Sequence, residues 1–194
     1  NADQADFVQD LSQPNGSHGQ WTPKVDSKFG IQLNARLSET YEAVAQVVSR
    51  YRYDGSTSPE LTWAFLRADI NPQTAVRIGR LGTEFYMLAD SRLVGYSYLT
   101  VRPPVDYFSV LPFTYIDGID AAYTLPLSGA LIRGKIYAGY TGEKIPFIDQ
   151  PWDLSGSPMR GVHVDYQRGP WQARLSYADI RFSREMPIGS LLTN

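Results

Sequence analysis

Eight basic side chains occupy the polar positions of segments in which polar and apolar residues alternate. They are Arg36, Arg50, Arg52, Arg67, Arg77, Arg133, Lys135 and Arg174. Burying such a cation without a partner costs several kcal/mol, so the face that carries them is expected to contact water. If that face lines a bore, its positive field favours anionic solutes. A competing interpretation is that these cations pair with carboxylates of the same face and only hold the fold together. Those carboxylates are Glu42, Asp69, Asp120 and Asp165.

A catalytic arrangement has less support. His163, Asp165 and Ser176 have the residue types of a base, an orienting acid and a nucleophile, but no Gly-x-Ser-x-Gly turn surrounds Ser176. The chain has no cysteine and only two histidines, His18 and His163, which argues against thiolate and histidine-rich metal sites. We therefore expect a protein that is not an enzyme, with no catalytic residue, no metal and no cofactor.

Composition narrows the class further. The 194 residues include 18 Lys and Arg against 20 Asp and Glu, a net charge of −2, and the pI is about 5.7, so we expect no nucleic-acid partner. A mean hydropathy of −0.29 is typical of a soluble protein. No apolar stretch reaches the roughly 18 residues of a membrane-spanning helix, but this does not apply to spanning strands.

The charged residues have to be positioned by strands. Residues 1–27 are polar and irregular and are interpreted as an N-terminal arm. From residue 28 a period of two begins, as in Phe29, Ile31 and Leu33, which alternate with polar positions. The expected strands are 28–38, 41–52, 62–70, 76–79, 118–125, 130–140, 161–168 and 171–180. Residues 28–194 are therefore predicted to form one β-barrel region.

Connections between these strands alternate between short and long. The short ones fall at 38–40, 71–74, 126–129 and 169–170, and the long ones at 82–117 and 141–158. Strands of about 8–11 residues with this alternation are typical of outer-membrane barrels. The predicted fold is therefore an all-β, antiparallel transmembrane β-barrel with about eight strands in this chain and a hydrated lumen.

A soluble antiparallel β-sandwich or barrel that binds a ligand is the alternative, because such a sheet also alternates. Its weakness is the small size of the apolar residues, which would pack loosely between two sheets. These include Ala43, Ala45, Ala64, Ala68, Ala138 and Ala173.

Several separated motifs resemble, in order, a family of porin-like outer-membrane proteins of Gram-negative bacteria. They are Gly30–Ala35, the turn Tyr53–Gly55, Val76–Leu81, Asp90–Tyr96, Val101–Val105 and Asp117–Ala121. The resemblance covers roughly residues 26–140. It implies a channel for passive diffusion of small hydrophilic solutes, a homotrimer, contact with outer-membrane lipid and a leader cleaved on export. Porin-like chains are longer and end in an aromatic strand, so we expect this chain to be part of a larger barrel.

The resemblance also makes the long segment 82–117 the candidate for a loop that folds inward and narrows the pore. Its charged side chains would face the basic wall or anchor the loop, and Pro103–Pro104 would stiffen its tip. The expected constriction-loop residues are Glu84, Asp90, Arg92, Arg102, Asp106 and Asp117. The alternative is an external loop that only covers the mouth of the barrel.

Overall fold

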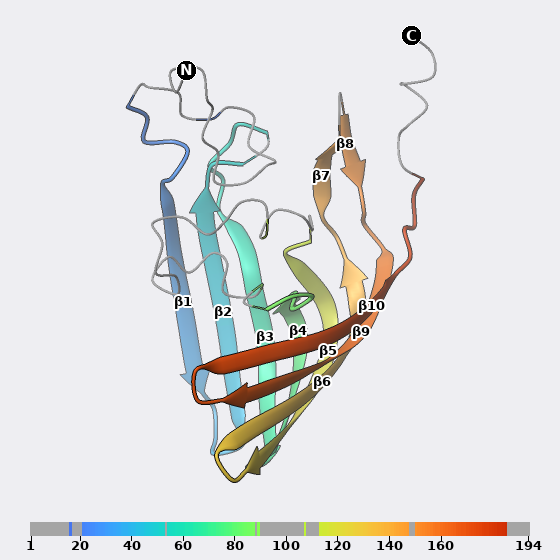
Figure 1. Cartoon of the computed structure of the whole chain (residues 1–194). Helices are drawn as coiled ribbons and strands as arrows, with labels where there is room; N and C mark the ends of the chain where they lie inside the picture. The colour runs from blue at the N-terminus through green and yellow to red at the C-terminus, as the bar shows by residue number, and fades with distance from the viewer. Residues whose placement is uncertain are drawn as a thin grey trace.

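One antiparallel sheet dominates the structure (Figure 1), a computed structural model that describes residues 16, 21–52, 54–87, 89, 107, 113–147 and 150–185. Its eight strands are hydrogen-bonded in the order β1-β2-β3-β4-β5-β6-β9-β10. They are β1 (Lys28–Arg36), β2 (Tyr41–Arg50), β3 (Glu60–Asn71), β4 (Thr74–Gly82), β5 (Tyr115–Leu127), β6 (Ala130–Thr141), β9 (Ser157–Arg168) and β10 (Trp171–Ile180). The predicted all-β, antiparallel fold of about eight strands is confirmed. Among the described residues, no helix has the length and apolar character needed to cross a membrane.

Two details differ from the expected strands. The segment 141–158, expected to be a loop, contains a two-stranded hairpin, β7 (Lys144–Phe147) and β8 (Gln150–Asp153). Each of its strands contains a proline, and Pro146 pairs with Pro151, which weakens the sequence signal of a strand. In addition, β4 and β9 are longer than expected, because Leu81 and Met159 near their ends lie in a buried core.

The sheet has two ends and two free edges. Figure 1 shows the short turns between β1 and β2, β3 and β4, β5 and β6, and β9 and β10 at one end, and the β7–β8 hairpin at the other. We call these the short-turn end and the hairpin end. Within the described residues β1 and β10 do not pair with each other, so the sheet curls without closing.

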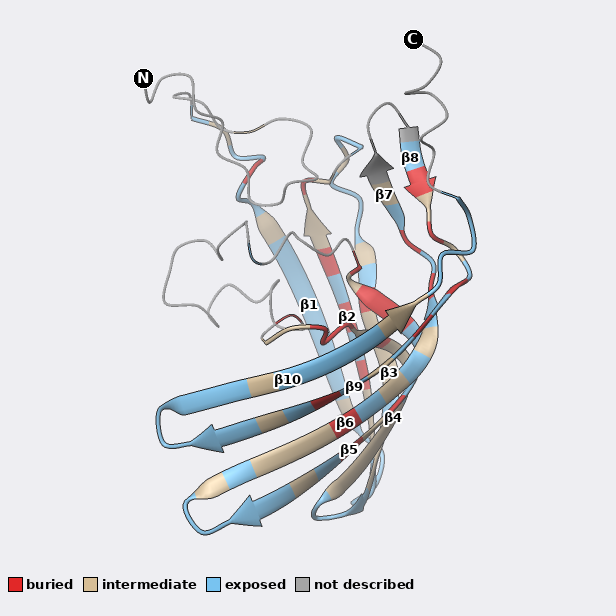
Figure 2. Cartoon of the chain, turned by 45° about the vertical axis from the view of Figure 1, so that its right-hand side comes forward, coloured by how far each residue is buried: buried red, intermediate tan, exposed pale blue. Residues whose placement is uncertain are grey.

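The two faces of the sheet differ in chemistry as the alternation predicts. The outer face is apolar and largely exposed, as Figure 2 shows for β1 and β10. Its most exposed side chains include Ile31, Leu33, Ile70, Ile78, Ile136, Leu175 and Tyr177. The inner face carries the larger group of charged residues, and the outer face carries the ion pairs of Arg80 with Asp117 and of Arg160 with Asp179. Leu175 is 80% exposed, which contradicts the sandwich alternative, in which this face would be covered by a second layer.

A row of glycines crosses the middle of the sheet. Gly79 on β4 pairs with Gly118 on β5, which pairs with Gly139 on β6. A Cβ atom at Gly118 would lie 2.2 Å from the carbonyl oxygen of Ala138, and one at Gly139 would lie 2.6 Å from that of Asp117. Neighbouring backbones therefore approach here more closely than any side chain allows.

The inner face contains an apolar core near the hairpin end. Leu81, Ile116 and Met159 from the sheet pack there with residues of the connections. The connecting residues are Phe85, Phe113, Trp152 and Leu154. The ring of Phe85 contacts those of Phe113 and Tyr137, with centroids 5.9 and 6.0 Å apart. This core fixes the residues that directly follow β4 against the sheet.

Candidate functional site

A buried group of ionisable side chains lies on the inner face beside this core. We call it the charge cluster, and its members are Arg77, Glu84, Asp120, Lys135, His163, Asp165 and Arg174. Glu84 is at its centre and is 7% exposed, and Lys135, which pairs with it, is 2% exposed. Arg77 donates a hydrogen bond from Nη2 to Glu84 Oε1 at 3.0 Å.

The register of the sheet brings these residues together. Arg77 on β4 is opposite Asp120 on β5, and Lys135 on β6 is opposite His163 on β9. On the next pair of strands, Asp165 on β9 is opposite Arg174 on β10. Because side chains at i and i+2 share a face and directly opposed residues are neighbours, the five strands form one continuous charged row.

Two arginines form multiple bonds in this row. The Nε of Arg77 donates to both carboxylate oxygens of Asp120 at 3.0 Å. Arg174 donates from Nε and Nη2 to Asp165 at 2.5 and 2.9 Å. Such forked guanidinium–carboxylate contacts are among the strongest hydrogen bonds in proteins. The interpretation that basic residues pair with carboxylates of the same face is therefore correct for Asp120 and Asp165.

Arg174 also holds the chain after β4 in place. Its Nη1 donates to the carbonyl oxygens of Glu84 and Tyr86 at 3.2 and 3.0 Å. One side chain on β10 thus fixes the backbone of a segment nearly ninety residues earlier in the sequence. The bond to Glu84 is to its backbone carbonyl oxygen, and the expected place of its side chain at a constriction stays a prediction.

The charges around Glu84 keep it ionised. Burial by itself raises the pKa of a carboxyl group, but the cations of Lys135 and Arg77 outweigh it and lower the pKa of Glu84 from 4.5 to about 2. Lys135, which we expected to contact water, is instead buried and neutralised by this carboxylate.

His163 is the buried member without a hydrogen bond. Its Nε2 lies 3.5 Å from Glu84 Oε2 and 3.6 Å from Asp165 Oδ2, and neither ring nitrogen has a hydrogen-bond partner. Ser176 is directly opposite on β10, but its side chain is exposed. The structure therefore brings the histidine and the aspartate together and adds Glu84, which the sequence analysis did not associate with them.

A polar hollow of about 370 Å³ extends from the charge cluster towards the short-turn end of the inner face. Its charged lining consists of three guanidinium groups and two carboxylates. These are Arg67, Arg77, Arg133, Asp69 and Asp120. Arg67 donates to Asp69 at 2.8 and 2.9 Å, which is the third of the four expected carboxylate pairings. The fourth carboxylate, Glu42, accepts a hydrogen bond from Asn34.

The remaining expected basic residues lie farther along the wall. Arg36 donates to the carbonyl oxygen of Ser38 at 3.4 Å, and Arg50 lies 3.9 Å from Glu60. Arg52 follows β2 in the connection to β3. Their role as pore-lining residues stays a prediction.

One expected constriction-loop residue is misplaced. Asp117 belongs to β5, and its carboxylate accepts two hydrogen bonds of 2.8 Å from Arg80. Both residues line a groove of the outer face. The prediction for Asp117 is wrong because β5 begins at Tyr115, before the apolar alternation becomes clear in the sequence. Asp90, Arg92, Arg102 and Asp106 lie outside the described residues.

In the described part of the chain, no group of three or more His, Asp or Glu side chains has an arrangement that could hold a metal ion. No protein-family model matches the sequence, and no curated protein matches it. Among solved structures, the chain is similar to OmpTdeltaL8, a loop L8 deletion mutant of OmpT, an outer membrane protein of Vibrio cholerae. The identity is 12%, the TM-score is 0.32, and the match covers 79% of this chain and 60% of the other. This chain thus spans less than two thirds of that protein, and a likeness at this level assigns no activity.

The expectation that the chain is not an enzyme has to be corrected. The structure places His163 between the carboxylates of Glu84 and Asp165, whereas the sequence analysis grouped it with Asp165 and Ser176. The expectation that the chain has no enzymatic activity is therefore withdrawn.

Proposed function

We propose that the chain forms part of the wall of an outer-membrane β-barrel channel. Small hydrophilic solutes diffuse through this channel, with a preference for anions. The observation that carries this proposal is the inverted distribution of residues: apolar side chains are exposed on the outer face and charged ones are gathered on the inner face. A soluble sheet buries its apolar face, whereas a barrel in lipid exposes it.

Aromatic side chains of the outer face support a membrane boundary at the short-turn end. Tyr41, Tyr123, Tyr166 and Trp171 are all exposed, and each lies within a few residues of a short turn. Tyrosine and tryptophan are enriched where membrane meets water, since their rings are amphipathic. These four residues come from β2, β5, β9 and β10, so they form a belt rather than a single patch.

The strand lengths fit the same environment. The eight strands of the sheet have between 9 and 13 residues, and a tilted strand needs about 9–11 residues to cross a bilayer. Long connections lie on the extracellular side in barrels of this kind. We therefore assign the hairpin end to the extracellular side and the short-turn end to the periplasmic side of a Gram-negative outer membrane.

The polar hollow supports the preference for anions. Three guanidinium groups and two carboxylates line it, and because Arg67 and Arg77 pair with carboxylates, its excess positive charge lies at Arg133. Solutes that pass along this part of the inner face would meet Arg67 and Arg133 first. The homotrimer and the inward position of residues 88–112 remain proposals that rest on the resemblance to porin-like proteins.

Membrane insertion is tested by refolding the chain into liposomes. We expect the strands to be protected from added protease and the protein to aggregate when detergent and lipid are both removed. A chain that stays monodisperse without detergent and does not enter liposomes would contradict the membrane location and with it the channel.

Channel activity is tested in planar bilayers under a salt gradient. We expect conductance with a reversal potential whose sign indicates selectivity for anions. Arg133→Glu should shift the reversal potential towards the value expected for cation selectivity. Arg168→Glu is the matched control, since this exposed residue ends β9 outside the hollow. Inserted protein without conductance would overturn the channel and leave the membrane fold intact.

A further inference from the structure

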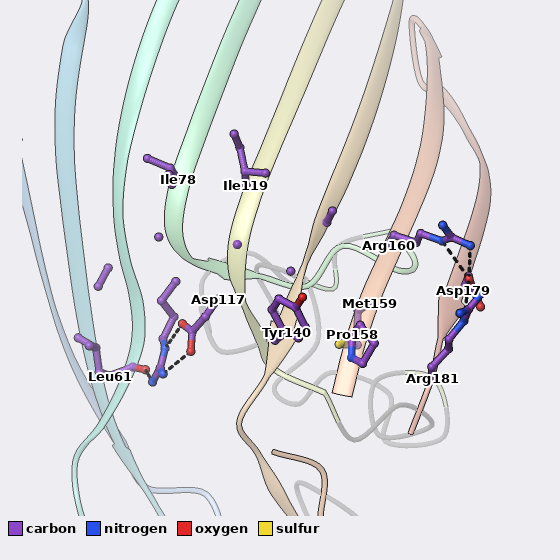
Figure 3. A pocket seen from close by; sticks show the side chains of 16 residues that line it. Leu61, Ile78, Asp117, Ile119, Tyr140, Pro158, Met159, Arg160, Asp179 and Arg181 are labelled. Atoms are coloured by element: carbon purple, nitrogen blue, oxygen red, sulfur yellow. Dashed lines mark hydrogen bonds and ion pairs between the residues drawn. The ribbon is translucent and has the colours of Figure 1, made fainter. Parts of the chain in front are cut away.

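A groove of about 870 Å³ lies on the outer face, where no residue of the charge cluster reaches. It crosses β3, β4, β5, β6 and β9 and extends to the end of β10 (Figure 3). The backbone of Gly79, Gly118 and Gly139 contributes to its floor, at the place where neighbouring strands approach most closely.

The floor of the groove is apolar and accessible. Ile78 is 57% exposed, Ile119 is 47% exposed and Tyr140 is 59% exposed. Ala64 and Ala138 between them are small and leave the floor open. An exposed apolar surface of this extent marks a binding site for another apolar group.

One side of the groove carries excess positive charge. Arg160 lies 2.8 Å from Asp179, and Arg181 lies 3.8 Å from the same carboxylate. The two arginines are 66% and 74% exposed, and Asp179 is 25% exposed. Figure 3 shows the three side chains together beside Met159 and Pro158. Two guanidinium groups share one carboxylate, so donors remain available for an anion.

The opposite side of the groove is neutral. Arg80 is bound by two hydrogen bonds to Asp117 and stacks over the ring of Tyr115 at 3.7 Å. The positive charge of the groove is therefore concentrated at Arg160 and Arg181. The backbone of Arg181 is fixed there, since its N–H donates to the carbonyl oxygen of Pro158 at 3.1 Å.

We propose that this groove binds a membrane lipid with a phosphate-bearing headgroup, the phosphate between Arg160 and Arg181 and an acyl chain on the floor over Ile78 and Ile119. The proposal rests on the membrane location proposed above. Guanidinium groups bind phosphate oxygens with forked, charge-assisted hydrogen bonds, and basic pockets beside membrane-spanning elements bind anionic headgroups. The positive charge of Arg160 and Arg181 matches the phosphate of such a lipid, and the apolar floor matches its acyl chain.

The groove's position in the sheet agrees with this ligand. Arg160 and Arg181 are near the hairpin end of β9 and β10, so they lie on the side of the long connections, where the headgroups of the outer leaflet would be. The aromatic belt lies near the opposite end of the same strands. The acyl chain would therefore run from the rim towards the middle of the bilayer.

Native mass spectrometry of the whole chain in a non-ionic detergent tests the proposal. The probes are diacyl phosphatidic acid, which has an exposed phosphate monoester, and phosphatidylcholine with the same acyl chains. We expect phosphatidic acid to be retained preferentially. The double variant Arg160→Gln/Arg181→Gln should bind it about tenfold more weakly or worse, as expected for lost charge-assisted hydrogen bonds.

Two further variants separate the groove from general attraction. Arg168→Gln removes an exposed cation of β9 far from the groove and should leave binding unchanged. Ala138→Phe fills the floor with all arginines intact and should also weaken binding. The lipid site would be overturned if Arg168→Gln lost as much phosphatidic acid binding as Arg160→Gln/Arg181→Gln. Full binding of phosphatidic acid by Ala138→Phe would overturn it as well.

The membrane location is tested separately by the liposome experiment. Protein that enters liposomes but binds phosphatidic acid no better than phosphatidylcholine contradicts only the groove proposal. Protein that fails to enter liposomes contradicts both proposals.

Discussion

Glu84 and Lys135 form a buried ion pair although 51 residues separate them in the sequence. Lys135 is in the middle of β6, whereas Glu84 is in the connection after β4. The pair therefore joins the start of the long segment to the wall of the sheet. Arg77, His163 and Arg174 surround the same carboxylate, so Glu84 is the acidic side chain shared by the largest number of members of the charge cluster.

Removing the charge of Glu84 should destabilise the fold. Glu84→Gln removes the nearer of the two carboxylates beside the buried ammonium of Lys135 and leaves Asp120 at 3.6 Å, so we expect a loss towards the lower end of the about 3–5 kcal/mol for breaking a buried pair. Urea unfolding in lipid vesicles, followed by tryptophan fluorescence, measures the loss. Glu39→Gln, at an exposed turn position, is the control and should be neutral. Adding Lys135→Met to Glu84→Gln should restore part of the stability, and no recovery would contradict the pairing.

Protonation of Glu84 at low pH should remove its ion pair with Lys135 and lower the stability of the fold. The pKa of Glu84 is lowered from 4.5 to about 2 by the cations of Lys135 and Arg77, which outweigh its burial. The unfolded chain therefore takes up this proton at a higher pH than the folded chain. Stability from this group is complete above pH 4.5 and is lost as the pH falls to about 2, on the order of 3 kcal/mol. Unfolding free energies of wild type and Glu84→Gln should converge over this range, and parallel curves would contradict the assignment.

Two glycines of the sheet should respond to alanine with opposite signs. A Cβ at Gly118 would lie 2.2 Å from the carbonyl oxygen of Ala138, so Gly118→Ala requires the backbone to move and should cost about 3 kcal/mol. Gly134 has no atom within 4 Å of a Cβ and no positive φ. Gly134→Ala should therefore be neutral or stabilising by about 0.4–1 kcal/mol. Thermal unfolding of both variants in the same detergent makes the comparison.

An arginine placed on the outer face should reveal a depth profile. Ile136 is 60% exposed in the middle of β6, and Leu127 is 47% exposed at the end of β5. In lipid, Ile136→Arg should cost about 2–4 kcal/mol and Leu127→Arg about 0–1 kcal/mol. Reversible unfolding from vesicles measures both. A soluble protein would show no such gradient, so equal effects would contradict the membrane location.

The sequence predicts the faces of the strands well, because alternation with a period of two depends only on local geometry. Arg77, Lys135 and Arg174 are for this reason correctly placed on the same face as Asp120 and Asp165. The position of Glu84 could not be predicted, since it follows the last residue of a strand and no periodicity constrains it. The signal that could have found it is the buried Phe85 next to it, an aromatic residue directly after an apolar strand end.

Other features of the structure depend on contacts between distant residues, which the alternation of polar and apolar residues does not predict. The β7–β8 hairpin has prolines where strand residues are expected, and the start of β5 at Tyr115 is fixed by packing of the next residue, Ile116, in the apolar core. The floor of the groove on the outer face forms because Ile78, Ile119 and Ala138 become neighbours, which requires the register of β4, β5 and β6. Register is set by the pairing of whole strands.

The contacts of Arg174 with the carbonyl groups of Glu84 and Tyr86 have a consequence for assembly. The last strand of the sheet supplies the guanidinium group that pairs with Asp165. Without Arg174 the charge cluster would have three carboxylates against the two cations Arg77 and Lys135. Since desolvating such charges singly is unfavourable, hairpins that crossed the bilayer one at a time would each face that barrier. We therefore expect insertion to be concerted, with β10 docking before the inner face leaves water, and slow because its decisive contacts are distant in sequence.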